Sequence, residues 1–431
     1  MRRFYSFFLL LAMPIIILRL LWRGIRQPGY LRHWGERFGF FSPPSGANAG
    51  TIWLHAVSVG EMRAASLLVR QIQQHYPGLP ILVSCMTPTG RATAEELFGN
   101  SVRCVYLPYD FYSAQRRLIA SFAPQVLLIL ETEIWPNLLA ACHREHVPAL
   151  LVNARLSEKS LRAYMRFAPV RSLAHGAMQS MQVIAAQSPA DDGRFRILGA
   201  ANSQITGNIK FDMTVDATQI AKGESWRSGL AKEKRILLAA STREGEEALL
   251  LDAYCRAFSA VERKKMPLVL VPRHPQRFDA VEALIRARNL AMQRRSIGEL
   301  TDECAVWLGD SMGEMAAYMA MCDVAFIGGS LLPLGGQNLI EACAQGKPVI
   351  MGPSTFNFAE ASQLAIEAGA MRQARDANEV MATAKSLLDD DAARLTMGAA
   401  AKSFAIAHAG ATKKTMALIA PLIAGKQNQR R

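Results

Sequence analysis

Short apolar runs alternate with amphipathic segments of helical length along most of the chain. In the first half, segments with helical spacing lie at Glu61–His75, Ser113–Phe122 and Pro136–His146. Apolar runs of strand length flank and separate them, at Ile52–Val57, Ile81–Ser84, Val102–Leu107, Val126–Leu130, Ala149–Val152 and Gln182–Ala185. This alternation predicts βαβ units, and therefore a parallel sheet with helices on both faces.

The alternation breaks once and then restarts. Residues 213–234 lack it and predict a linker with one polar helix. Five more runs follow, at Ile236–Ala240, Leu268–Val271, Val306–Leu308, Val324–Ile327 and Val349–Met351. The pattern predicts two Rossmann-like α/β domains, over 34–212 and 235–405, with a helix and tail over 406–431. Because ligands bind at the carboxyl ends of parallel strands, we expect the domains to face each other across a central cleft.

The N-terminus is apolar and flanked by arginines. Residues 4–18 carry no charge, and the run continues past Arg19 to Trp22, which is about the length that crosses a bilayer. We predict a hydrophobic membrane anchor helix over 1–26 that either spans the membrane or lies shallowly in it, with the main body in the cytosol. A secretory signal peptide is the alternative, but the nearest small-x-small pattern, Ala47-x-Ala49, lies far beyond the run.

The net charge of +13 narrows the possible partners. Residues 1–40 hold seven arginines against a single acid, Glu36, and this placement favours a membrane surface. The rest of the chain has no basic run with interleaved aromatics, so we expect no nucleic acid partner. The seven cysteines are scattered singly, which indicates reduced thiols and neither a disulfide framework nor a zinc site.

Candidate chemistry follows the strands of the first half. Glu61 falls in the first turn of a helix, where it could cap that helix together with Ser58 or act as a general base. Glu131 leaves a wholly apolar strand, and a partly buried carboxylate requires a partner or a ligand. Lys210 closes this half, where it could reach a charge in the cleft or remain an ordinary solvated lysine.

The second half carries residues suited to a phosphorylated nucleoside at its strand ends. They are Ser241-Thr242, Arg273-His274 and Gly313-Glu314-Met315. Arg273 offers a planar fork that matches a phosphate group, and His274 precedes a proline that opens a helix. Their repetition at successive strand ends favours a ligand site over unrelated surface residues.

Two glycine pairs organise this half. Gly328-Gly329 ends an apolar run, and Gly335-Gly336 precedes a helix-like segment. This arrangement is typical of anion sites, because glycines let the backbone approach and free N–H groups meet the anion. Asn338 and Glu341 lie three residues apart on one helical face and could hold a nucleoside. The alternative is an ordinary loop between a strand and a helix.

In combination these motifs resemble a known family. The motifs are Ser58-Val59-Gly60-Glu61, Glu131-Thr132-Glu133-Ile134-Trp135-Pro136-Asn137, Gly207-Asn208-Ile209-Lys210-Phe211-Asp212, Pro272-Arg273-His274-Pro275 and Gly335-Gly336-Gln337-Asn338-x-x-Glu341. Over nearly the whole chain they resemble the 3-deoxy-D-manno-octulosonic acid (Kdo) transferases, glycosyltransferase family 30, which add Kdo to lipid A precursors in lipopolysaccharide biosynthesis. The resemblance implies a GT-B glycosyltransferase at the bacterial inner membrane, with its catalytic domains on the cytoplasmic side.

The resemblance also implies roles for residues. It implies an inverting, metal-independent transfer without a cofactor, in which the N-terminal half binds the acceptor and the C-terminal half binds CMP-Kdo. Glu61 would be the general base, and Glu131 and Lys210 would stabilise the transition state. The residues expected at CMP are Arg273, His274, Gly313, Glu314, Met315, Asn338, Leu339, Ile340 and Glu341, with Ser241, Thr242 and Gly336 as additional donor contacts. The expected partners are CMP-Kdo, a lipid A precursor and inner-membrane lipid.

Two other kinds of protein fit the same pattern. One is another GT-B enzyme, either a membrane-associated transferase that uses a UDP-sugar or a nucleotide-sugar epimerase. The Arg273-His274-Pro275 element favours a CMP-linked acidic sugar, because it resembles the pairing in GT-B sialyltransferases. The other is a membrane-anchored nucleotide-binding protein without turnover, which would have no need of a carboxylate at Glu61.

Overall fold

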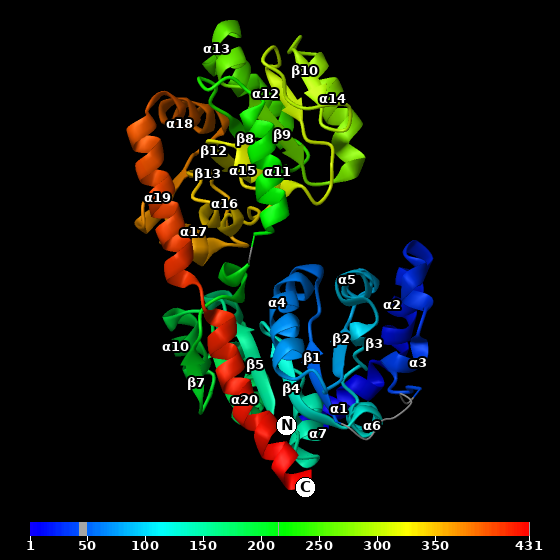
Figure 1. The fold of residues 1–431 in the computed structure, drawn as a ribbon. Helices are drawn as coiled ribbons and strands as arrows, with labels where there is room; N and C mark the ends of the chain where they lie inside the picture. The colour runs from blue at the N-terminus through cyan, green and yellow to red at the C-terminus, as the bar shows by residue number, and fades with distance from the viewer. Residues whose placement is uncertain (43–49, 214, 431) are drawn as a thin grey trace. The chain divides into compact units, whose positions relative to one another are not determined.

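The chain folds into two compact units, each built on its own parallel sheet (Figure 1). This computed structural model describes residues 1–42, 50–213 and 215–430. One unit comprises Met1–Asp212 and Ala409–Arg431, and the other comprises Met213–His408. The Ala47-x-Ala49 pattern considered as a cleavage site lies outside the described residues.

The first unit contains a seven-stranded parallel sheet in the order β3-β2-β1-β4-β5-β6-β7. Its strands are β1 Thr51–His55, β2 Ile81–Cys85, β3 Arg103–Tyr106, β4 Pro124–Leu130, β5 Ala149–Ala154, β6 Val183–Ala186 and β7 Ser203–Ile205. Strands β1, β2, β4 and β5 are buried along their whole length. Burial on both faces is why their sequences are continuous apolar runs without polar alternation.

The second unit contains a seven-stranded parallel sheet in the order β10-β11-β9-β8-β12-β13-β14. Its strands are β8 Leu237–Thr242, β9 Leu268–Pro272, β10 Met292–Arg294, β11 Val306–Leu308, β12 Val324–Ile327, β13 Val349–Met351 and β14 Met371–Gln373. The carboxyl ends of β11, β9, β8 and β12 are therefore consecutive along one edge of this sheet.

Helices cover both faces of the first sheet (Figure 1). They are α1 Arg2–Leu11, α2 Met13–Arg26, α3 Trp34–Arg37, α4 Val59–His75, α5 Pro88–Phe98, α6 Tyr112–Phe122, α7 Pro136–Arg144, α8 Glu158–Arg166, α9 Ala168–Ser180, α10 Pro189–Ile197 and α20 Ala411–Arg430. One core cluster joins Leu54 and Leu128 of the sheet to Leu68 of α4 and Ile419 of α20. The C-terminal helix thus completes the core of the first unit.

Helices of the second unit enclose its sheet in the same way. They are α11 Ala217–Ser228, α12 Glu246–Ala257, α13 Ala260–Lys265, α14 Phe278–Arg286, α15 Met315–Met321, α16 Ile340–Ala344, α17 Ala359–Glu367, α18 Ala377–Asp389 and α19 Asp391–His408. Its core cluster joins Leu270 of β9 and Phe326 of β12 to Leu251 of α12 and Val380 of α18. Each unit therefore has a complete hydrophobic core of its own.

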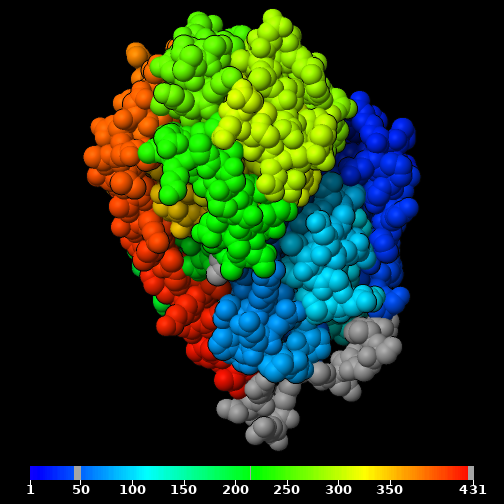
Figure 2. Space-filling model, turned by 45° about the horizontal axis from the view of Figure 1, so that its top comes forward, coloured from blue at the N-terminus to red at the C-terminus, as the bar shows by residue number. Residues whose placement is uncertain are grey.

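The N-terminal segment forms two helices and not the single anchor helix expected over 1–26. Helices α1 and α2 are bent by 54° relative to each other. Pro14 lies in the first turn of α2, where its ring and missing N–H interrupt a continuous helix. Among the described residues, no single helix is long and apolar enough to cross a membrane, although the bent pair passes that test together. Figure 2 shows this segment as a dark-blue column at the surface.

Three strands lie where the apolar pattern predicted none. Strands β7, β10 and β14 are each three residues long and lie at sheet edges. An edge strand has one neighbour and a partly solvated surface, so it needs no apolar run. The segment over 213–234, expected as a linker with one polar helix, contains that helix as α11, which belongs to the second unit. Gly223 allows its close packing on α15, because a Cβ there would lie 2.2 Å from the Ala317 carbonyl oxygen.

Candidate functional site

Glu61 lies in the first turn of α4, directly after the carboxyl end of β1. Ser58 is the N-cap, and its hydroxyl accepts a hydrogen bond from the Glu61 N–H (3.2 Å). The Glu61 carboxylate accepts in turn from the Ser58 hydroxyl at Oε1 (2.8 Å) and from the Val57 N–H at Oε2 (2.7 Å). The expected capping interaction is present, and it also fixes the orientation of the carboxylate.

The environment of Glu61 shifts its proton affinity. Burial raises the pKa of the Glu61 carboxyl group; hydrogen bonds from Val57 and Ser58 oppose this shift, and the negative charge of Glu131 adds to it. A carboxylate with a raised pKa is a stronger base than a solvated one. The two interpretations of Glu61 are therefore compatible, since the cap holds a basic carboxylate in place.

Glu131 and Lys210 form an ion pair in the first unit, with 3.4 Å between Lys210 Nζ and Glu131 Oε1. Both side chains are partly buried, with 28% of Glu131 and 24% of Lys210 exposed. Glu131 follows β4, the neighbour of β1, with a positive φ of 58°. That conformation costs a non-glycine residue about 1 kcal/mol or more and is frequently found at functional sites. The structure thus brings together the two residues expected to act with Glu61.

Two further residues of this region were absent from the expected site. Asn153, at the end of β5, also has a positive φ (53°), and its Oδ1 accepts from the Ile209 N–H (3.0 Å), next to Lys210. Burial, with the charge of Glu61 added, raises the pKa of Glu133 to about 7. Glu133 belongs to the Glu131–Asn137 motif, but only the structure shows which of its two carboxyl groups lies in the less polar environment.

In the second unit, the residues expected at the nucleotide gather at the carboxyl ends of β11, β9, β8 and β12. A pocket of about 220 Å³ lies between the segments after β11 and β12. Its lining includes Gly313, Met315, Ile340 and Glu341, together with Met213, Val215, Asp216, Ala316, Ala344 and Gln345. The mixture of apolar walls with a few polar groups is typical of a small-molecule site.

Asn338 and Glu341 contact each other at the start of α16, as their spacing suggested. Asn338 Nδ2 donates to Glu341 Oε1 (3.1 Å), and Asn338 Oδ1 accepts from the Ile340 N–H (3.1 Å). Asn338 therefore orients the carboxylate that lines the pocket. Leu339 and Ile340, expected at CMP as well, have buried side chains. Their side chains are largely enclosed by the fold of the second unit.

Glu314 has protein partners within the second unit. Its carboxylate pairs with Lys222 of α11 and with Arg295 (3.3 Å), and it accepts from the Ser311 hydroxyl. Burial would raise the pKa of Glu314, but the hydrogen bonds from Lys222 and Ser311 and the charge of Arg295 outweigh it and hold the pKa below its ordinary value. The arrangement fixes the turn that presents Gly313 and Met315 to the pocket.

Arg273 and His274 are exposed residues directly after β9. The Arg273 N–H donates to the Thr242 carbonyl of β8 (2.9 Å), which ties the two strand ends together. Ser241 has a positive φ of 55° beside them. The Thr242 side chain is buried and donates to Glu247 Oε1 (3.3 Å), so its hydroxyl is directed into the protein interior.

The glycine loop after β12 holds a carboxylate of the protein itself. Glu246, fully buried at the start of α12, accepts from the N–H groups of Gly329 (2.6 Å) and Leu331 (2.9 Å). The Gly329 N–H, which was expected to meet a ligand anion, is therefore occupied by a protein carboxylate. Gly328 is required for the close approach of β8, because a Cβ would lie 2.6 Å from the Ser241 carbonyl oxygen. Gly336 has a positive φ of 74° in the same loop.

Within the described parts of the chain, no group of three or more His, Cys, Asp or Glu side chains is arranged to hold a metal ion.

Comparison with solved structures identifies the type of fold. UDP-GlcNAc 2-epimerase from Neisseria meningitidis superposes with a TM-score of 0.60 at 14% identity, covering 86% of this chain and 100% of that one. A glycosyltransferase from Rickettsia africae superposes with a TM-score of 0.56 at 13% identity, covering 87% and 99%. With two parallel-sheet α/β units, the chain has the architecture of GT-B proteins. At such low identity these likenesses define the fold alone.

Sequence comparison defines the family. Residues 32–213 match the family described as 3-Deoxy-D-manno-octulosonic-acid transferase (kdotransferase). The 3-deoxy-D-manno-octulosonic acid transferase of Bordetella pertussis is 41% identical over 413 residues, 92% of this chain and 94% of the relative. The enzyme of the same name from Haemophilus influenzae is 35% identical over 426 residues, 98% and 99% of the two chains. The chain therefore belongs to the family of 3-deoxy-D-manno-octulosonic acid transferases.

Proposed function

We propose that this protein transfers Kdo from CMP-Kdo to a lipid A precursor, with inversion at the anomeric carbon and without a metal ion. Family membership supports the assignment of Kdo as the transferred sugar. The observation that carries the proposed chemistry is Glu61, a carboxylate of raised pKa held by Val57 and Ser58 at the end of a central strand. The acceptor would bind to the first unit and the donor to the second.

Glu61 acts as the general base in this proposal. Its carboxylate takes the proton from an acceptor hydroxyl, and the oxygen attacks the anomeric carbon of Kdo. A new C–O bond forms as the bond between that carbon and the CMP phosphate oxygen breaks, and CMP leaves with the electron pair. The raised pKa suits this role, because a base works best when its pKa approaches the working pH.

Glu131 and Lys210 stabilise the transition state. The Lys210 ammonium group offsets negative charge on the donor, and Glu131 holds that ammonium through their ion pair. Asn153 supports the same arrangement from β5, because it binds the backbone next to Lys210. Partial burial strengthens these charge interactions relative to bulk water.

The second unit binds CMP-Kdo at the carboxyl edge of its sheet. The pocket lined by Gly313, Met315, Ile340 and Glu341 accommodates part of the nucleoside. Arg273 and His274 lie two strands from β12 on the same edge and would contact the phosphate and the acidic sugar. The Glu246 carboxylate keeps the glycine loop in shape, so the loop positions the start of α16 without itself binding the phosphate.

The N-terminal helices attach the enzyme to the cytoplasmic face of the inner membrane. Large apolar side chains of α1 and α2, such as Phe8, Ile15 and Leu18, are exposed. Ser6 exchanges hydrogen bonds with Asn137 of α7 (2.9 and 3.1 Å), so one side of α1 is held by the first unit. The bend and the one-sided attachment favour shallow insertion of the apolar face over a straight span.

The direct test of the proposed function is a transfer assay with purified full-length protein. CMP-Kdo and a tetra-acylated lipid A precursor are incubated with the protein in detergent, and the products are resolved by mass. We expect the acceptor to gain at least one Kdo unit. Absence of product with CMP-Kdo, together with transfer from a UDP-sugar, would overturn the assignment of the donor.

A further inference from the structure

A pocket of about 390 Å³ in the first unit lies beside Glu61. It lies at the carboxyl edge of the sheet and is covered by α2. Its lining residues Val57, Thr87, Tyr109 and Glu133 follow β1, β2, β3 and β4, respectively. Its full lining is Ile16, Arg19, Leu20, Arg23, Tyr30, Arg37, Val57, Met86, Thr87, Tyr109, Glu133 and Trp135. Arginines, hydroxyl groups and apolar side chains thus surround one cavity large enough for a small-molecule group.

Arg37 is a buried cation with unused hydrogen-bond donors. Its side chain belongs to a residue that is only 2% exposed; Nη1 donates to the Met86 carbonyl (3.2 Å), and the guanidinium stacks 3.9 Å from the ring centre of Tyr106. Within the described residues, Arg37 Nε and Nη2 have no hydrogen-bond partner. A buried charged donor without a partner is costly, so these two N–H groups indicate a missing acceptor.

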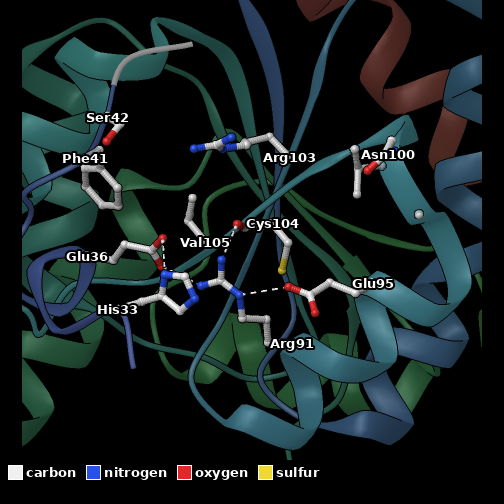
Figure 3. A pocket seen from close by; sticks show the side chains of 12 residues that line it. His33, Glu36, Phe41, Ser42, Arg91, Glu95, Asn100, Arg103, Cys104 and Val105 are labelled. Carbon is white, nitrogen blue, oxygen red and sulfur yellow. Dashed lines mark hydrogen bonds and ion pairs between the residues drawn. The ribbon is translucent and has the colours of Figure 1, made fainter. Parts of the chain in front are cut away.

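The nearest acidic residue in the sequence does not neutralise Arg37. Figure 3 shows Glu36 directed to Arg91, with 2.7 Å between Glu36 Oε2 and Arg91 Nη1. The same oxygen accepts from the Tyr106 N–H (2.8 Å), and Oε1 lies 3.5 Å from His33. The Glu36 carboxylate is therefore paired with Arg91, Tyr106 and His33, and not with Arg37.

Two more arginines share the cavity with Arg37. Arg19, Arg23 and Arg37 line the cavity together with Tyr109. Their positive charges oppose the rise that burial causes in the pKa of Tyr109. In the described part of the chain, none of the three forms an ion pair. Three cations that line one cavity without an ion-pair partner form a strong site for an anion of high charge. The one carboxyl group in the lining is Glu133, whose pKa burial raises to about 7.

The wall of the cavity adjoins the proposed catalytic base through Val57. Val57 forms part of its wall and donates its N–H to Glu61 Oε2 (2.7 Å). Glu133 lines the same cavity and feels the charge of Glu61. An anion bound at the arginines would therefore place a neighbouring hydroxyl group on the Glu61 side.

We propose that Arg37, with Arg23 and Arg19, binds a phosphate group carried by the glycolipid acceptor and so positions the acceptor hydroxyl for Glu61. This inference rests on the proposed function, because it assigns the cavity to the acceptor. The apolar part of an amphiphilic acceptor would contact the apolar lining residues, which are Ile16, Leu20 and Trp135. Helix α2 supplies Ile16 and Leu20 as well as the cations Arg19 and Arg23.

The test compares binding of two acceptors that differ only in phosphate. Equilibrium binding to the full-length protein in detergent is measured for a phosphorylated lipid A precursor and for the same lipid after phosphatase treatment. We expect the phosphorylated lipid to bind more tightly, and Arg23→Gln and Arg37→Lys to weaken its binding on the order of ten-fold, as loss of a charge-assisted hydrogen bond predicts. Binding of the dephosphorylated lipid should change little.

Arg26→Gln is the matched control, because Arg26 lies on the same helix, stacks on Trp22 (4.4 Å) and is outside the cavity lining. It should keep the difference between the two lipids. Equal losses in all three variants, or no loss in Arg23→Gln and Arg37→Lys, would overturn the proposal. Binding to anionic phospholipid vesicles without glycolipid is measured as well. If Arg23→Gln weakens this binding as much as it weakens binding of the phosphorylated lipid, the site belongs to membrane headgroups and the proposal is overturned.

A competition experiment with inorganic phosphate tests whether the cavity binds a phosphate group as such. Competition by free phosphate against the phosphorylated lipid in the wild type, but not in Arg23→Gln, would support an anion site in this cavity. Competition that persists unchanged in Arg23→Gln would count against it. Because binding is measured without CMP-Kdo, a protein that binds the phosphorylated acceptor but transfers nothing would contradict the proposed function and leave the anion site supported.

Discussion

At the scale of single residues, the proposed chemistry depends on how the protein controls three carboxyl groups near one strand edge. Glu61 is held by Val57 and Ser58, Glu131 is paired with Lys210, and burial raises the pKa of Glu133 to about 7. The sequence predicted that Glu61, Glu131 and Lys210 belong to one site. It could not separate the environments of Glu131 and Glu133, because these depend on tertiary burial.

The charge of Glu131 should be visible in the pH dependence of transfer. Its negative charge contributes to the raised pKa of Glu61, and Glu61 must be deprotonated to act as a base. In Glu131→Gln that contribution disappears, so the pKa of Glu61 falls. We expect the acidic limb of the profile of kcat/KM against pH to move to lower pH, whatever happens to the maximum rate. A limb that stays in place or moves to higher pH would contradict the coupling.

Glu133 should make stability depend on pH. Its pKa rises from 4.5 to about 7 on folding, so the folded state holds the proton more tightly. The contribution to stability is therefore complete below about pH 4.5 and is lost as pH rises through about 7. Glu133→Gln should raise the free energy of unfolding at pH 8 by about 1–2 kcal/mol, after allowance for partial exposure, and by much less at pH 4. Urea unfolding at the two pH values measures this difference, and equal effects at both would contradict it.

The glycine loop shows a limit of residue-level prediction. Gly328-Gly329 was expected to offer free N–H groups to a ligand phosphate, but the Gly329 and Leu331 N–H groups bind Glu246. Glu246 lies 83 residues before Gly329 in the sequence, at the start of another helix. Local motif reasoning had no means of finding a protein carboxylate that fills the loop from so far along the chain.

At the scale of elements, the apolar pattern predicted the interior strands and the edge strand β3, but it missed the three other edge strands. Interior strands such as β4 and β12 are buried along their whole length, and their continuous apolar runs are visible in the sequence. Strands β7, β10 and β14 are short, partly polar and bonded on one side only. Their existence depends on a neighbour and not on their own sequence.

A carboxylate fastens the C-terminal helix to the first unit. Asp212 accepts hydrogen bonds from the N–H groups of Gly410 and Thr412, at the point where the chain re-enters this unit. Asp212→Ala should remove both bonds and reduce the stability of the first unit by about 2–3 kcal/mol. Hydrogen exchange should report lost protection at the start of α20.

Asp216→Ala is the matched control for Asp212→Ala. Asp216 caps α11 through the Thr218 N–H (2.9 Å) and belongs to the second unit. Its loss should cost about 1 kcal/mol there and leave α20 protected. If Asp212→Ala also leaves the α20 amides fully protected, the two hydrogen bonds do not fasten the helix.

At the scale of the whole molecule, the sequence predicted the fold class and the family, while the structure corrects the prediction for the N-terminal segment. Composition predicted one anchor helix over 1–26, but Pro14 divides the segment into two bent helices. Composition cannot reveal this, because apolar content is the same for a straight helix and a bent pair. The contacts of Ser6 with Asn137 are equally invisible without the tertiary structure.

The exposed apolar face of these helices should govern membrane binding. Ile15 and Leu18 are 68% and 64% exposed. Burying each in lipid would contribute about 1.5–3 kcal/mol, so the double variant Ile15→Gln/Leu18→Gln should weaken vesicle binding by well over ten-fold. Leu395→Gln, at a residue of the second unit that is also 68% exposed, should have no effect in the same sedimentation assay. Unchanged binding of the double variant would contradict shallow insertion through this face.

The central claim is that Glu61 is the base for transfer to the acceptor, while the second unit binds the nucleotide independently. The most direct measurement is Glu61→Gln in the mass-resolved transfer assay, together with CMP affinity by calorimetry. Glutamine keeps the size of the side chain but cannot take a proton. We expect transfer to fall on the order of 100-fold or more, with CMP affinity and folding unchanged. Transfer near the wild-type rate, with the protein folded and CMP bound, would contradict the claim.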